Sequence, residues 1–176
     1  TSLVLSGGSI KDGGNNNATL VLPTPGANAS LGFNKNIVID TVVPLIASSV
    51  LGATNAYVDI TFSENIYTTG SVAAITINDL LLTFTSNGGS ATGASIVALN
   101  KITGGALTGG EDKIRVMITI TGSVSGTETV AIQAGANKVF DRAGNVMGAT
   151  QTTGNISLVL SGTTPVVSTI YSLTPD

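Results

Sequence analysis

The sequence contains no histidine, no cysteine and no tryptophan, and only 10% of its 176 residues are charged. Without histidine there is no Ser-His-Asp relay and no imidazole-ligated metal site. Without cysteine there is no thiolate nucleophile, no iron–sulfur cluster and no disulfide framework. Because these absences remove the commonest reaction centres, we expect that the protein is not an enzyme.

Charge and hydropathy exclude two further classes of partner. The seven Lys and Arg residues form no cluster and the net charge is −3. Nucleic-acid binding requires several basic residues to neutralise phosphates, so we expect no nucleic-acid partner. There is no uninterrupted run of 18 apolar residues, and therefore no membrane insertion is expected.

What the sequence does contain is apolar residues that alternate with Thr and Ser, as in 57–62 and 113–121. A period of two is typical of strands with one buried and one exposed face. Gly-rich and Asn-rich breakers separate these segments, which favours an all-β antiparallel sandwich. Strands are predicted near 3–6, 18–22, 31–39, 45–51, 56–63, 72–78, 80–86, 94–102, 113–121, 128–134, 155–161 and 165–172.

The two ends of the chain resemble each other. Ser9–Asn16 aligns with Lys138–Asn145, and Ile37–Pro44 aligns with Leu158–Pro165 in the same order. This predicts a tandem array with a period near 120 residues, although chance similarity between low-complexity β segments is the alternative. In the array, residues 1–40 are the closing strands of a preceding repeat, 41–164 a complete unit, and 165–176 the first strand of a following repeat. Residues 1–40 and 165–176 are alternatively strands exchanged between molecules.

Three motifs also carry a family resemblance. Val58–Tyr67 (VDITFSENIY) looks like the opening of bacterial immunoglobulin-like repeats, Asp141–Asn145 (DRAGN) resembles their D-x-A-G-N loop, and Asp40–Pro44 (DTVVP) is similar to their linker. The order of the motifs matches the family across the complete unit. The corresponding Asp12–Asn16 (DGGNN) and the outgoing linker Ser161–Pro165 (SGTTP) depart from the pattern. The resemblance implies an immunoglobulin-like Greek-key sandwich from a large cell-surface adhesin or S-layer-like protein.

A metal site is the chemistry that this resemblance implies. The incoming linker and two loops share one pole of an immunoglobulin-like sandwich, which would bring together Asp40, Glu64, Asp141 and Asn145. Calcium takes six to eight oxygen ligands in irregular geometry, so these residues are predicted to bind structural calcium. In the alternative interpretation, Asp141 only closes an Asx-turn and Glu64 faces solvent. The pair Glu111-Asp112 is expected to form a solvated turn.

The function predicted from these features is that of a structural repeat of an extracellular, cell-surface adhesin or fibre. Its partners would be neighbouring repeats or identical subunits, with any glycan or protein receptor bound elsewhere in the chain. One alternative is a filament subunit joined by strand exchange, as in donor-strand complementation. Another is a carbohydrate-binding module, which the small number of Phe and Tyr residues, seven in all, does not favour.

Overall fold

The computed structural model describes residues 4–35, 39–68 and 72–160. The chain divides into two compact units, Thr1–Ile39 and Asp40–Asp176. In the described part of the first unit, the regular element is a one-turn helix, α1 (Leu31–Asn34). Among the described residues, no helix has the length and apolar character needed to cross a membrane.

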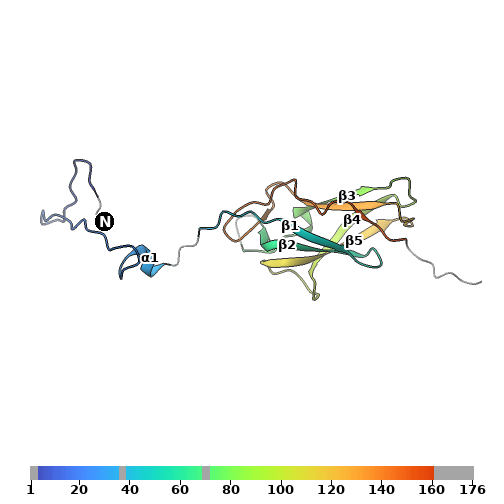
Figure 1. Cartoon of the computed structure of the whole chain (residues 1–176), viewed down its shortest axis with the longest axis horizontal. Helices are drawn as coiled ribbons and strands as arrows, with labels where there is room; N and C mark the ends of the chain where they lie inside the picture. The colour runs from blue at the N-terminus through green and yellow to red at the C-terminus, as the bar shows by residue number, and fades with distance from the viewer. Residues whose placement is uncertain (1–3, 36–38, 69–71, 161–176) are drawn as a thin grey trace, which may run out of the picture. The chain divides into compact units, whose positions relative to one another are not determined.

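The second unit is a sandwich of two antiparallel sheets (Figure 1). The first sheet has the order β1-β2-β5-β4, with β7 pairing beside β2, and the second has the order β3-β6-β8. The strands are β1 (Ile46–Leu51), β2 (Tyr57–Thr68), β3 (Leu80–Thr85), β4 (Gly93–Lys101), β5 (Glu111–Thr121), β6 (Thr129–Ala134), β7 (Val139–Phe140) and β8 (Ile156–Ser157). The prediction of an all-β sandwich is confirmed.

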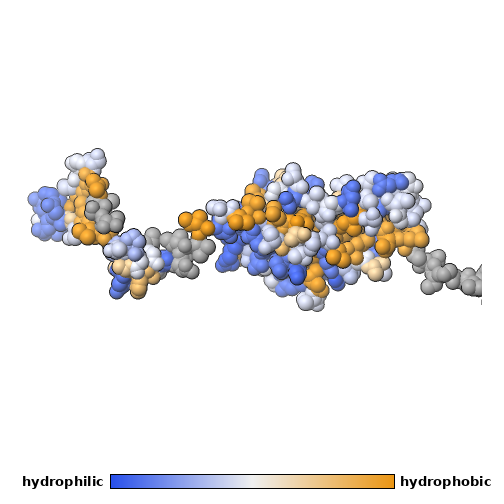
Figure 2. Space-filling view, in the orientation of Figure 1, coloured by the Kyte–Doolittle hydropathy of each residue, from blue (hydrophilic) through white to orange (hydrophobic). Residues whose placement is uncertain are grey.

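The core forms from the inward-facing residues of both sheets. In β6, Val130 and Ile132 are fully buried and alternate with half-buried neighbours, as the period of two predicts. Val58 and Ile60 of β2 pack into the same cluster from the opposite sheet. The outer surface mixes hydrophobic and hydrophilic side chains, as the visible face in Figure 2 shows.

Several predicted strands are wrong. Residues 4–6 and 18–22 form no strand. The segment predicted as a strand at 31–39 begins instead with the helix α1. The Ser30 hydroxyl accepts a hydrogen bond from Phe33 N (3.1 Å), as a helix N-cap does, and this bond favours the helical turn. The segment 72–78, predicted as a strand, instead leads into a 3-10 helix, η1 (Ile77–Asp79). The Asp79 carboxylate accepts hydrogen bonds from the Thr76 amide and hydroxyl (2.8 and 2.9 Å), which turns the chain. The strand predicted at 165–172 lies outside the described residues.

The chain enters and leaves the sandwich at opposite ends of β2. Tyr67 and Thr68, at the end of β2, pair with β7, and the segment beginning at Asp40 lies beside the loop that follows β7. At the start of β2, the adjoining Asn55 is hydrogen-bonded to Val159. A strand of 12 residues spans roughly 35 to 40 Å. We call the end near Asp40 the entry end and the end near Val159 the exit end (Figure 1).

Candidate metal site

Three carboxylates meet at the entry end of the sandwich. One oxygen from each of Asp40, Glu64 and Asp141 lies within 4.8 Å of the other two. Asp40 precedes β1, Asp141 follows β7, and Glu64 lies within β2. The β2–β5 register is irregular between Thr61 and Ile66, around Glu64. The structure therefore brings together the three acidic residues of the group that the motif resemblance implied.

The fourth residue, Asn145, is hydrogen-bonded to Asp141 and Asp40. Its backbone amide donates to Asp141 Oδ1 (2.8 Å) and its side-chain amide nitrogen donates to Asp141 Oδ2 (2.7 Å). The same nitrogen also donates to the backbone carbonyl of Asp40 (3.0 Å), which fixes the incoming segment to the loop. The Asp141 carboxylate accepts from the Asn145 amide, four residues on, and so closes the loop, and one of its oxygens also lies within 4.8 Å of an oxygen of each of the other two acids.

The electrostatics of the cluster penalise the ionised form of one member. Burial raises the pKa of Glu64, and the negative charges of Asp141 and then Asp40 raise it further. Glu64 is half-buried and lies within β2, which continues to Thr68, beyond the end of the strand predicted at 56–63. In the described part of the chain, the ion pairs are Lys101–Glu111 and Arg115–Asp59, and neither includes a member of this cluster. A bound cation would offset the repulsion.

The first unit contains a second loop of the same kind. The Asn16 amide donates to Asp12 Oδ1 (2.9 Å) and its side-chain nitrogen donates to Asp12 Oδ2 (3.0 Å), as Asn145 does with Asp141. Asp12 N donates to Asn16 O (3.0 Å), and Asp141 N donates to Asn145 O (3.1 Å). The two bridges that flank the loops, Lys11↔Asn17 and Phe140↔Val146, are also equivalent in the alignment.

The backbone conformation of the two loops matches as well. Asn15 has φ of 67° and the aligned Gly144 has φ of 94°. Glycine adopts this left-handed region freely, and asparagine is the residue that most often replaces it there. The replacement of Gly by Asn, a departure from the family motif, therefore preserves the shape of the loop.

Two other acidic residues have structural roles that the sequence did not reveal. Glu128 is fully buried, and its carboxylate accepts hydrogen bonds from the amides of Ala91, Ser125 and Gly126. These bonds, the one from Ala91 above all, lower the pKa of Glu128 to about 2. Glu111, expected in a solvated turn, accepts from Thr108 and Gly109 and begins β5, so that expectation is wrong.

Comparison of the chain with family models, with curated proteins and with solved structures gives no match.

Proposed function

We propose that this chain is part of a tandem array of immunoglobulin-like repeats in an extracellular, cell-surface adhesin or fibre, in which the repeats give extension and mechanical stability. The observation that carries the proposal is the repeated loop. Asp12–Asn16 and Asp141–Asn145 share their side-chain bonds, backbone bonds and left-handed position. A chance alignment of polar segments gives no reason for these local geometries to coincide.

The path of the chain through the second unit supports the same function. The chain enters at Asp40 and leaves at Val159, at opposite ends of β2. Repeats joined in this way would follow one another end to end, so that each adds its long dimension to a fibre. A fold whose termini share one end would not extend a fibre in this manner.

The order of the strands supports the immunoglobulin-like part of the proposal. If the strands are lettered A to G as β1, β2, β3, β4, β5, β6 and β8, the two sheets have the orders A-B-E-D and C-F-G. Constant-type immunoglobulin domains have these orders. The motifs that resemble bacterial repeats in the sequence lie on the segment before β1, on β2 and on the loop after β7.

We further propose that calcium binds at the entry end, held by Asp40, Glu64, Asp141 and the amide oxygen of Asn145. The proximity of three carboxylates supports this, and so does the raised pKa of Glu64. Calcium accepts oxygen ligands from loops and tolerates irregular geometry. It would fix the segment that begins at Asp40 to the loop after β7 and so stiffen the point where the chain enters the sandwich.

The native polypeptide tests the proposal most directly. An antibody raised against the second unit should detect a cell-surface polypeptide whose intact mass is that of many repeats. A native polypeptide of about the size of this chain would contradict the array and favour strand exchange between subunits.

Single-molecule stretching of the full chain provides a mechanical test. Unfolding of the sandwich, about 120 residues, should appear as one discrete force peak followed by an increase of roughly 40 nm in contour length. Calcium should raise the peak force of the wild type and leave that of Asp141→Asn unchanged. A chain that extends without a peak would exclude a mechanical role, and an equal response of the two proteins would exclude calcium at this site.

A further inference from the structure

The outer edge of β3 is free to form hydrogen bonds. β3 pairs with β6 on one side, and within the described ranges no strand pairs with its other side. The carbonyl of Asp79 accepts a hydrogen bond from Gly135 N (2.8 Å), which shows which residues direct their backbone groups toward β6: Asp79 and every second residue after it. Because backbone groups alternate in direction along a strand, the amides and carbonyls of Leu80, Leu82 and Phe84 point away from β6.

This edge lacks the features that normally prevent edge-to-edge pairing. Proteins protect exposed strand edges with bulges, charged residues or short strands. The edge strands β1 and β4 both contain register irregularities, and β8 has only two residues. β3 pairs with β6 over six consecutive residues without irregularity, and its sequence, LLLTFT, contains no charge.

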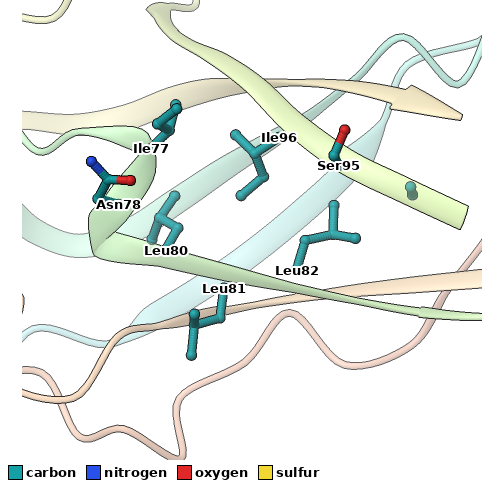
Figure 3. Close-up of a pocket in the computed structure, with 8 residues that line it drawn as sticks. Ile77, Asn78, Leu80, Leu81, Leu82, Ser95 and Ile96 are labelled. Carbon is teal, nitrogen blue, oxygen red and sulfur yellow. The ribbon is translucent and has the colours of Figure 1, made fainter.

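An apolar groove of about 310 Å³ lies beside the same edge, between β3 and β4. Figure 3 shows Leu80, Leu82 and Ile96 converging in it, whereas Leu81 points to the other side of β3. Two large hydrophobic side chains that line the groove are exposed: Leu81 (52%) and Ile77 (42%). Apolar exposure of this kind next to unpaired backbone groups marks a surface for strand pairing.

We infer that the free edge of β3 binds β3 of a second copy of this chain, so that two sandwiches pair side by side about a two-fold axis. The choice of a second copy follows from the strand itself, which has no charge to repel its own image and presents the same edge on both sides of the axis. Lateral pairing of this kind goes beyond the end-to-end array, since it would join neighbouring fibres.

The alternation of the backbone groups fixes the register. In an antiparallel pair centred on Leu82, Leu82 faces Leu82 of the second copy, and Leu80 faces Phe84 of the second copy, as hydrogen-bonded pairs. Leu81 then lies opposite Thr83 of the second copy as a non-hydrogen-bonded pair on the outer face, where the two Cα atoms are about 4.5 Å apart. The two three-stranded sheets join into one sheet, in which Leu81 gains Thr83 of the second copy as a cross-strand neighbour.

Charge substitutions on the full chain test the pairing. Sedimentation equilibrium should detect a dimer of the wild type. Thr83→Lys and Thr83→Glu should each raise the dimer dissociation constant by roughly tenfold or more, since each places two like charges across the axis. An equimolar mixture of the two variants should restore the dimer. Thr119→Lys is the matched control, because Thr119 is an exposed strand residue of the other sheet, and it should leave the dimer unchanged.

A disulfide tests the register, because the wild type has no cysteine. Leu81→Cys mixed with Thr83→Cys should cross-link faster under mild oxidation than either variant alone, since only the mixture places two thiols opposite each other. A wild type that is monomeric at millimolar concentration would overturn the inference. A dimer that persists in the Thr83→Lys variant would also overturn it. If Ile170→Lys dissociates the dimer and Thr83→Lys does not, the strand that pairs with the edge of β3 is the C-terminal segment rather than β3 of a second copy.

Discussion

Asn55 should be one of the most sensitive polar positions in the sandwich. It lies in the turn between β1 and β2, is 5% exposed, and holds the segment at the exit end through both atoms of its amide. Asn55 Nδ2 donates to Val159 O (2.7 Å), and Val159 N donates to Asn55 Oδ1 (2.9 Å). Its backbone has φ of 56°, in the left-handed region.

The expected effect of Asn55→Ala has two parts. Each lost hydrogen bond contributes about 1 kcal/mol to stability, which gives about 2 kcal/mol for the pair. Alanine in the left-handed region costs about 1 kcal/mol more than asparagine, whose short polar side chain tolerates it. The free energy of unfolding should therefore fall by about 3 kcal/mol. Asn55→Gly removes the same bonds without the backbone strain, so it should lower the free energy by about 2 kcal/mol.

Asn137 supplies a matched control for the backbone part. It has the same φ of 56°, but its side chain is exposed. Asn137→Ala should therefore cost only about 1 kcal/mol. Urea unfolding followed by far-UV circular dichroism measures all three variants against the wild type, and an unchanged m-value shows that the transitions are comparable. Equal losses for Asn55→Ala and Asn137→Ala would refute the contribution of the bonds to Val159.

Three other positions give predictions that calorimetry can check. The pKa of Glu128 is lowered from 4.5 to about 2, so the stability that its ionised form contributes is complete above pH 4.5 and is lost as the pH falls through 2. The Glu128→Gln variant should therefore melt at a lower temperature than the wild type at pH 7, and it should lose less stability than the wild type between pH 4.5 and pH 2. The raised pKa of Glu64 means that its ionised form is destabilising at pH 7. In EDTA, Glu64→Gln should therefore have a higher melting temperature than the wild type, and calcium should not raise it further. A lower melting temperature of the variant in EDTA would contradict the repulsion between the carboxylates. Ile60→Ala, in the fully buried core, should cost about 2 to 5 kcal/mol, and Val50→Ala, at a 65% exposed position, less than about 1 kcal/mol.

The fold class could be predicted because the strongest strands have one buried and one exposed face. Residues 113–121 alternate along nearly their full length, and β5 forms there. The pattern failed where a local hydrogen bond decided the conformation. Ser30 caps a turn of helix before Phe33, and Asp79 turns the chain after Thr76, and neither bond alters the hydrophobic alternation from which the strands were predicted.

The candidate site was predicted in part for a different reason. Asp40, Glu64 and Asp141 are far apart in the sequence, and the residues alone do not indicate that they meet; the motif resemblance placed them at one pole. Glu128 has no such motif. Its partner Ala91 is 37 positions away, so only the folded chain shows that this carboxylate is buried and saturated with amide donors.

The directions of β1 and β8 explain why the two ends of the sandwich would resist extension. β1 runs from the entry end toward Asn55, and β8 runs toward the exit end, where Val159 follows it. A pull applied at Asp40 and Val159 would act along both strands rather than across them. The β1–β2 and β6–β8 hydrogen bonds would then be stretched together, in shear, instead of one after another. β8 pairs through only two residues, so the bonds between Asn55 and Val159, together with the one from Leu158 N to Glu128 O (2.9 Å), add to the resistance at the exit end. Asn55→Ala should therefore lower the unfolding force by more than Asn137→Ala does, and equal forces would show that the exit segment is held by other contacts.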